Sequence, residues 1–285
     1  MKKMYQQIQL PIDMSDGLVM DGKEAKALGE MLREEYKKAE PFEHIVMDGF
    51  LPDDLISRVR ANFPTEKLNS DIVFDMGYAG HHKRQILPLE CNASAREFFA
   101  FMNSAPVLQF LEGLTGIEAL LPDPYFVGGG FHETSRGGKL GVHADFRINE
   151  QLNIQRRLNL LIYLNEDWND EWRGQLELWD KSMTECRARV SPLWNRCVVF
   201  STDADTWHGH PDELMTPDGV KRRSVALYYY TASKSLYGEV PNLGTMYKAR
   251  PSDDAVTKAV ARSLVIDQYL RDYLPAAAYR GIARI

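Results

Sequence analysis

The sequence predicts an α+β protein from three features of the chain. In the first third, apolar residues recur at helical spacing. From Pro122 to about Thr231 the pattern changes to short β-rich runs separated by Gly, Pro, Asn and Asp, and after Pro241 the helical spacing returns. Helices and strands that occupy separate parts of a chain are typical of an α+β layout.

Three segments of the first third are expected to be helical. GKEAKALGEMLREEYKKAE carries its apolar residues on one face, at Ala25, Leu28, Met31, Leu32 and Tyr36. In LPDDLISRVRANFP, Asp53 or Asp54 is expected to cap a helix that Pro64 stops. SAREFFAFMNSAPVLQFLEGLTG predicts one or two further helices, ending at Gly113 or Gly116.

The strands are expected in six runs: PYFVGGGFHE, LGVHADF, RLNLLIYLN, GQLELWD, NRCVVFST and RSVALYYYT. Strands at such close spacing predict a sandwich or barrel, of which a double-sheet jelly roll is one form. In the tail, Ser252 is the expected cap of a helix in DDAVTKAVARSLVIDQYL. We therefore expect one domain with a helix-rich support at 1–121, a β core at 122–231 and a helical extension at 232–285.

Composition excludes several classes of protein. The 285 residues include 34 Lys plus Arg and 40 Asp plus Glu, so no overall positive field favours nucleic acid or an anionic membrane. No run approaches the about 18 apolar residues of a membrane helix, and MKKMYQQIQLPIDMSDG lacks the apolar core of a secretory signal. Cys91, Cys186 and Cys197 form no CxxC pair, so neither a disulfide framework nor a zinc knuckle is indicated. A cytoplasmic location is expected, and the oligomeric state is left open.

The run GVHADF suggests a metal site. In a strand, residues two apart project from the same face, so His143 and Asp145 lie side by side. About sixty residues later, STDADTWHGHPDE offers His208 and His210. Two histidines and a carboxylate form the facial triad of non-haem Fe(II) oxygenases, which leaves positions for a cosubstrate and dioxygen. An HxD pair alone is common and more often reflects a simple hydrogen bond.

The sequence also contains residues that can bind a carboxylate. In KRRSVALYYYT, strand alternation places Arg222, Ser224 and Tyr228 on one face and Arg223 on the other. A guanidinium with a hydroxyl two residues later can bind a carboxylate. Tyr163, in RLNLLIYLN, can add a phenolic donor to the same group.

These motifs, together with LNLLIYLNEDW and RGQLELW, resemble the Fe(II) and 2-oxoglutarate dependent dioxygenases, most closely their prolyl 4-hydroxylase-like branch. The resemblance spans roughly residues 125–231. It implies that His143, Asp145 and His208 are the iron ligands. It also implies that Arg222 holds the distal carboxylate of 2-oxoglutarate, assisted by Tyr163 and Ser224.

The resemblance further implies a double-stranded β-helix and a hydroxylation that consumes dioxygen and converts 2-oxoglutarate to succinate and CO2. The substrate, a small metabolite or a residue of a peptide or protein, is left open. Two departures from the family pattern stand out. An inserted loop, PDELMTPDGVK, lengthens the spacing from His208 to Arg222, and Arg173-Gly174 replaces a Gly-Gly pair.

Alternative readings stay open beside this one. The same three ligands could serve a zinc hydrolase, or the fold could be a jelly-roll binding module without catalysis. Halogenation is disfavoured because Asp145 occupies the place of a halide. His210 competes with His208 as a ligand, and His132 could lie near the iron-bound end of 2-oxoglutarate. GYAGHHKRQ, at 77–85, is either a solvated loop or a flexible cover whose cations meet an acidic substrate.

Overall fold

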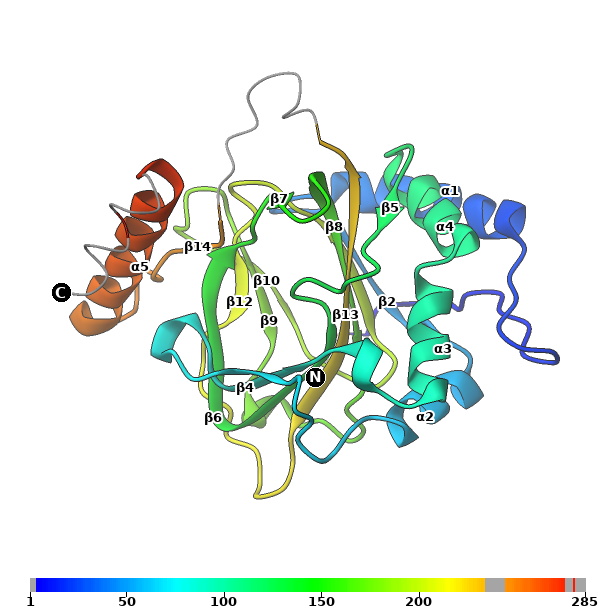
Figure 1. Ribbon diagram of the computed structural model, residues 1–285, viewed down its shortest axis with the longest axis horizontal. Coiled ribbons are helices and arrows are strands. Elements are labelled where there is room, and N and C mark those ends of the chain that lie inside the picture. Colours follow the sequence, from blue (N-terminus) through cyan, green and yellow to red (C-terminus); the bar gives the residue numbers. More distant parts are fainter. Residues whose placement is uncertain (1–3, 234–243, 275–278, 280–285) are drawn as a thin grey trace.

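A computed structural model describes residues 4–233, 244–274 and 279. A curled sheet forms the centre, with helices α1 to α4 on one side and α5 on the opposite side (Figure 1). The helices are α1 (Gly22–Lys38), α2 (Asp53–Ala61), α3 (Ala93–Met102), α4 (Ala105–Thr115) and α5 (Ala255–Tyr273). This arrangement confirms the α+β prediction.

The strands are β1 (Gln6–Gln7), β2 (His44–Asp48), β3 (Ile72–Phe74), β4 (His81–Ile86), β5 (Leu121–Pro122), β6 (Gly130–Ala144), β7 (Ile148–Asn149), β8 (Ile154–Tyr163), β9 (Leu176–Trp179), β10 (Cys186–Val190), β11 (Cys197–Ser201), β12 (His208–His210), β13 (Arg222–Ala232) and β14 (Met246–Tyr247). They pair in the order β1-β2-β11-β8-β13-β6-β12-β9-β10, and β4 and β14 also pair with β6. The two predicted runs PYFVGGGFHE and LGVHADF thus contribute to one long strand, β6.

Strand β6 links the two halves of the curled sheet. Its first part, at 130–134, lies between β4 and β13, and its last part lies beside β12 and β14. Four strands from the expected helical support, β1 to β4, also join the sheet. The division of the chain at 121 and 231 stays a prediction.

The packing of α1 on α4 differs in detail from the predicted face. Ala25, Leu32 and Tyr36 are buried as expected, but Met31 is 76% exposed, so its assignment to the core is wrong. Gly29 is buried instead, because a Cβ there would lie 2.2 Å from the carbonyl oxygen of Phe110. The close approach of two helix backbones therefore shifts the buried face by part of a turn.

The helix ends resolve the alternatives left by the sequence. Gly113 lies inside α4, whereas Gly116 ends the helix with a φ of 71°, a conformation that favours glycine. Helix α2 has Pro52 at its N-cap, so neither Asp53 nor Asp54 is the cap. At α5 the predicted cap Ser252 is wrong, because the carboxylate of Asp254 accepts a hydrogen bond from the amide of Thr257 at 2.7 Å.

The largest hydrophobic core lies between the sheet and helices α1 to α4, and it includes Phe98, Phe110, Phe131 and Leu160. It supports the strands that carry polar residues toward the opposite face. Among the described residues, no helix has the length and apolar character needed to cross a lipid bilayer.

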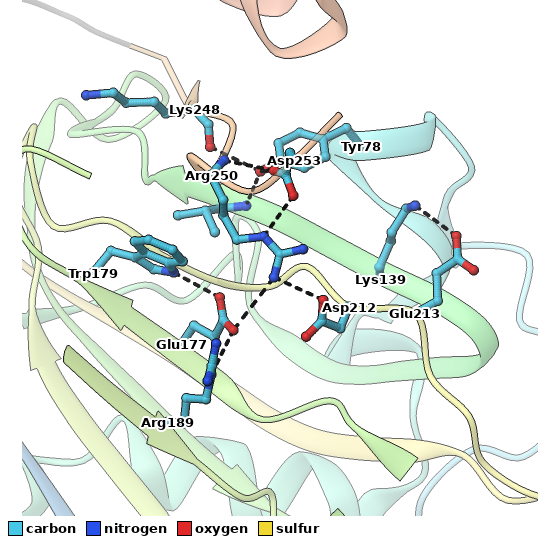
Figure 2. Close-up of polar contacts among 11 residues, drawn as sticks. Tyr78, Lys139, Glu177, Trp179, Arg189, Asp212, Glu213, Lys248, Arg250 and Asp253 are labelled. Atoms are coloured by element: carbon cyan, nitrogen blue, oxygen red, sulfur yellow. Dashed lines mark hydrogen bonds and ion pairs between the residues drawn. The ribbon is translucent and has the colours of Figure 1, made fainter. Parts of the chain in front are cut away.

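The C-terminal extension is tied to the sheet by Arg250 (Figure 2). Its guanidinium donates to Asp253 Oδ1 at 2.9 Å and to Asp212 Oδ1 at 3.0 Å, and Nη1 lies 3.8 Å from Glu177 Oε1. The side chain of Glu177 on β9 is 3% exposed. Just upstream, β14 adds Met246 and Tyr247 to the edge of β6. Arg250 thus adds a charged contact to the hydrogen bonds that also hold this segment, which include those of Tyr78 with the carbonyl of Lys248 and of Tyr247 with the carbonyl of Ala79.

We expect Arg250→Ala to lower the free energy of unfolding by roughly 2–3 kcal/mol, because it removes a cation from a half-buried network that contains a buried carboxylate. Arg271→Ala is the matched control, since that arginine pairs with Asp267 at the surface with 56% of its side chain exposed. The control should cost less than about 0.5 kcal/mol. Urea denaturation measures both, and equal losses would show that Arg250 is only a surface contact.

Candidate active site

Three side chains with metal-binding atoms converge at one end of the curled sheet. His143 lies near the end of β6, Asp145 follows that strand, and His208 opens β12. His208 is the direct cross-strand partner of His143. One ligand atom from each of the three residues lies within 4.8 Å of the other two.

Both histidines are held in the same tautomer by the backbone. Nδ1 of His143 lies 2.9 Å from the carbonyl oxygen of Gly141, and Nδ1 of His208 lies 3.0 Å from that of Thr206. Because a carbonyl only accepts hydrogen bonds, Nδ1 is the donor in each ring, and Nε2 is the ring atom directed toward Asp145. Burial, together with the neighbouring His208, lowers the pKa of His143 and so favours its neutral form. An imidazole whose Nδ1 is engaged by a backbone carbonyl presents Nε2 as its metal-binding atom.

Asp145 is kept ionised by its neighbours. Burial alone would raise the pKa of this carboxyl group, but the charge of Arg156 and contacts with both histidines hold the pKa well below its usual range. Nη2 of Arg156 lies 2.9 Å from Oδ2 of Asp145, and Nδ2 of Asn159 donates to the same oxygen at 2.7 Å. The donor set is therefore two imidazoles and one carboxylate, which fits Fe(II).

The three residues open onto a cavity of about 180 Å³. His143, Asp145, His208, Arg222, Ser224 and Tyr228 are among its lining residues. Arg222 and Ser224 are nearly buried, with 6% and 3% exposure. The structure thus brings the two histidines, the aspartate, the arginine and the serine together around one cavity.

Tyr163 lies behind Arg222 and does not line the cavity. It is fully buried, and its hydroxyl accepts a hydrogen bond from Nη2 of Arg222 at 3.4 Å. Nε of Arg222 donates to the carbonyl of Gly174 at 2.8 Å. Gly174 has a φ of +75°, and a Cβ there would lie 3.1 Å from Cδ of Arg222, so glycine lets the chain approach the guanidinium. These two hydrogen bonds engage Nε and Nη2 and so fix the orientation of Arg222. Neither of them uses Nη1.

The register of β13 separates the two neighbouring arginines. Arg222 pairs with Thr134 on β6, and Arg223 pairs with Glu133. Alternation therefore turns Arg222 into the cavity and Arg223 to the other face. There, Nε of Arg223 donates to Oε2 of Glu133 at 2.8 Å.

The inserted loop packs against β6. Leu214 is fully buried, and its amide and carbonyl bond with the carbonyl of Gly138 and the amide of Gly137. The side chain of Leu214 also lies beside Gly174, where a Cβ would be 2.5 Å away. The insertion therefore supports the wall near Arg222.

His210 and His132 also line the cavity. His210 is 4% exposed, and neither of its ring nitrogens has a hydrogen-bond partner among the described residues. Nε2 of His132 lies 3.0 Å from the carbonyl of Gly128. Burial lowers the pKa of both histidines well below the usual range. His210 lies outside the metal-binding group formed by His143, Asp145 and His208.

Sequence reasoning missed Arg156. Simple alternation places Arg157, not Arg156, on the face of Asn159. A bulge between β8 and β13 shifts the register at this point, since Tyr229 pairs with Leu158 but Tyr230 pairs with Arg156. Arg156 consequently reaches the cavity, where its guanidinium stacks 3.4 Å above the ring of Tyr228.

Tyr247 was also missed as a site residue, and Lys83 was considered only as one of the cations of a flexible cover. Tyr247 comes from the C-terminal extension, and its ring lies 5.5 Å from that of His143. Lys83 lies in the segment at 77–85, where a solvated loop was the first alternative. That alternative is wrong for Lys83, because β4 pairs with β6 and the side chain is 7% exposed in the wall of the cavity. Alternation in HHKRQ, with Lys83 and Gln85 on one face, was the available signal.

A second group of residues with metal-binding atoms lies nearby on the surface. Asp75, His81 and His82 bring their ligand atoms within 4.8 Å of one another, but Asp75 and His82 are exposed. Nδ1 of His81 is already engaged with Oδ1 of Asp75 at 2.5 Å. The buried triad is the group that faces a cavity.

Residues 129–230 match the family model of the 2OG-Fe(II) oxygenase superfamily. A comparison with curated proteins found no match. Among solved structures, a prolyl hydroxylase from Trichoplax adhaerens, in complex with a peptide of hypoxia inducible factor, is 16% identical with a TM-score of 0.51. That alignment covers 76% of this chain and 96% of that one.

Two further structures show the same architecture. A prolyl-4-hydroxylase from Pseudomonas putida is 19% identical with a TM-score of 0.50, over 72% of this chain and 98% of that one. The non-haem α-ketoglutarate dependent epimerase SnoN of nogalamycin biosynthesis is 15% identical with a TM-score of 0.50, over 81% and 88%. At these identities the likenesses show a common fold. They support the predicted double-stranded β-helix.

The match to the family model covers the strands that carry the triad and Arg222. Its cofactors, Fe(II) and 2-oxoglutarate, agree with the donor set of His143, Asp145 and His208. Residues 129–230 therefore match the 2OG-Fe(II) oxygenase superfamily, in agreement with the resemblance of the sequence motifs.

Proposed function

We propose that this protein is a dioxygenase that uses Fe(II), 2-oxoglutarate and dioxygen to hydroxylate an unactivated C–H bond. The observation that carries the proposal is the convergence of His143, Asp145 and His208 in one buried cavity, with Arg222 in the wall of that cavity. Such a site needs a metal and an anionic ligand to complete it.

The triad holds the metal in this proposal. His143 and His208 present Nε2 because their Nδ1 atoms are engaged by backbone carbonyls. Arg156 and Asn159 orient Asp145 and keep it ionised, so its charge is available to the metal. Bound Fe(II) with dioxygen would supply the oxidation, in which 2-oxoglutarate loses CO2 to give succinate and one oxygen atom enters the substrate.

Arg222 is the proposed partner of the distal carboxylate of 2-oxoglutarate. Gly174 holds its Nε, and Tyr163 stabilises one side of the guanidinium, so the arginine is already oriented. Ser224 lies two residues further along β13, on the same face, and can donate a hydroxyl hydrogen bond. These residues bind and orient the cosubstrate and exclude water from it.

The two alternatives from the sequence explain the site less well. A zinc hydrolase with the same ligands would leave Arg222 and its supporting contacts without a purpose. A non-catalytic binding module would bury Arg222 without an anionic partner, an arrangement with a large desolvation cost. Release of succinate and CO2 from 2-oxoglutarate with added Fe(II) separates the three possibilities, because only the oxygenase produces them.

The type of substrate stays open within this proposal. Two structural neighbours are prolyl hydroxylases and a third is an epimerase, so the fold is compatible with a peptide or a small molecule as substrate. A metabolite and peptide screen coupled to succinate release can identify it. Mass spectrometry of the product then decides the reaction: hydroxylation adds one oxygen atom, whereas epimerisation leaves the mass unchanged.

We expect Asp145→Asn to lower metal affinity by at least about 100-fold and to abolish succinate formation, because it removes the negative charge from the donor set. Asparagine keeps an oxygen that can accept from Arg156. Alanine is less suitable because it would leave that buried guanidinium without its partner. Equilibrium dialysis against Mn(II), followed by elemental analysis, measures the affinity.

Asp205→Asn is the matched control for this variant. The carboxylate of Asp205 pairs with Lys181 and is 40% exposed, so this variant should bind metal like the wild type. Retention of both metal and cosubstrate turnover in Asp145→Asn would exclude Asp145 as a ligand.

We expect Arg222→Ala to weaken 2-oxoglutarate binding by roughly 10- to 100-fold, the range for loss of a charge-assisted pair. Metal binding should be unchanged, because Arg222 does not touch the triad. Arg223→Ala should leave 2-oxoglutarate binding unchanged, because Arg223 points to Glu133 on the other face. Isothermal titration of Mn(II)-loaded protein measures both variants, and the reverse pattern would assign the cosubstrate to Arg223.

A further inference from the structure

Lys83 is a buried cation that the proposed roles leave unused. It lies on β4, is 7% exposed and lines the cavity. Its ammonium lies 4.4 Å from the ring centroid of Phe74. Within the described part of the chain, no carboxylate lies within ion-pairing distance of it. An ammonium in such a place has lost hydration without gaining a counter-charge.

The sheet register places Lys83 and Arg222 on either side of one residue. Thr134 on β6 is the cross-strand partner of Lys83 on β4 and also of Arg222 on β13. Residues in register across a sheet point to the same face, and neighbouring strands are about 4.8 Å apart. The two cationic side chains therefore enter the cavity from backbones about 10 Å apart, close enough for one ligand to meet both.

The charges of the cavity wall are unbalanced. Its charged residues, apart from histidines, are Lys83, Asp145, Arg156 and Arg222. Asp145 is paired with Arg156, so the charges of Lys83 and Arg222 are left without a carboxylate. A bound divalent metal ion would make the wall more positive. The cavity is thus built for more negative charge than the described chain supplies.

Two further observations agree with a missing anionic ligand. Burial, reinforced by the charge of Arg222, lowers the pKa of Lys83 to about 8, so the site destabilises the ammonium when no anion is bound. His210, in the same wall, has two ring nitrogens without hydrogen-bond partners among the described residues. Neither feature benefits the fold of the free protein.

We propose that Lys83 and Arg222 together form a carboxylate-binding subsite, in which the ammonium of Lys83 binds a ligand carboxylate directly. Two sources share this chemistry, namely the distal carboxylate of 2-oxoglutarate and a carboxylate on the substrate. In the first case Lys83 helps to bind the cosubstrate. In the second case the substrate is an organic acid that Lys83 binds. This proposal deepens the proposed function and rests on it for the identity of the cosubstrate.

The test compares wild-type protein with Lys83→Met, which keeps a long apolar side chain and removes the charge. Lys221→Met is the matched control, because Lys221 adjoins Arg222 in sequence but pairs with Glu133 at 2.9 Å. Isothermal titration of Mn(II)-loaded protein uses three probes: 2-oxoglutarate, 2-oxobutanoate, which lacks the distal carboxylate, and succinate added after saturation with 2-oxoglutarate. Succinate is also titrated into metal-free protein.

If Lys83 binds the cosubstrate, Lys83→Met weakens 2-oxoglutarate binding roughly tenfold or more and leaves 2-oxobutanoate binding unchanged. If Lys83 binds the substrate, 2-oxoglutarate binding is unchanged, and succinate binds the saturated wild type but not the variant. In either case Lys221→Met behaves like the wild type. The melting temperature of ligand-free Lys83→Met should also rise, because the variant removes an uncompensated buried charge.

Equal affinities of wild type and Lys83→Met for all three probes would overturn this proposal while leaving the proposed function intact. Failure of the wild type to bind Mn(II) and 2-oxoglutarate would instead contradict the proposed function. In that event the titration of metal-free protein with succinate still decides whether Lys83 binds a carboxylate. Loss of succinate binding in Lys83→Met supports the proposed subsite. Equal binding to the wild type and the variant, or no binding to either, overturns it.

Discussion

The register of β6 is the constraint on which the rest of the site depends. One end of this strand brings His143 opposite His208, and the other end aligns Thr134 with Lys83 and Arg222. Because side chains alternate between the two faces of a sheet, a slip of one residue in β6 would turn His143 and Thr134 to the other face and separate them from these partners. The apolar face packed against the helices prevents such a slip, since it would expose residues such as Phe131.

The site also depends on charged side chains that are buried in the cavity wall. Asp145 is stabilised as an anion by Arg156 and Asn159, so the triad is assembled before any metal arrives. Arg222 is oriented by neutral groups only, and Lys83 has no carboxylate partner among the described residues. A cavity with these charges is costly for the free protein and favourable for an anionic ligand. The charges that favour ligand binding in this cavity therefore lower the stability of the ligand-free protein.

The predictable part of the site is the part set by local spacing. His143 and Asp145 share a face because they are two residues apart, and Arg222 faces the cavity while Arg223 does not for the same reason. Arg156 escaped prediction because a bulge reverses the alternation. Tyr247 escaped because its position depends on the pairing of β14 with β6, which no local pattern contains. For Lys83 the alternation in HHKRQ gives the face, but only the pairing of β4 with β6 decides that this face lies in the cavity wall.

The fold shows the same division. The position of α1 follows from its apolar spacing, but the exposure of Met31 follows from the crossing with α4, where Gly29 allows the backbones to meet. Gly116 could be distinguished from Gly113 only by that packing, because both end a plausible helical pattern. Tertiary contacts, rather than propensity, decided these details.

The most direct test of the central claim is an anomalous diffraction measurement on crystals grown without oxygen in the presence of Fe(II) and 2-oxoglutarate. We predict one iron peak within about 2.0–2.3 Å of Nε2 of His143, Nε2 of His208 and a carboxylate oxygen of Asp145, with the distal carboxylate of 2-oxoglutarate on Arg222. An iron peak elsewhere, or none at this triad in fully soaked crystals, would contradict it.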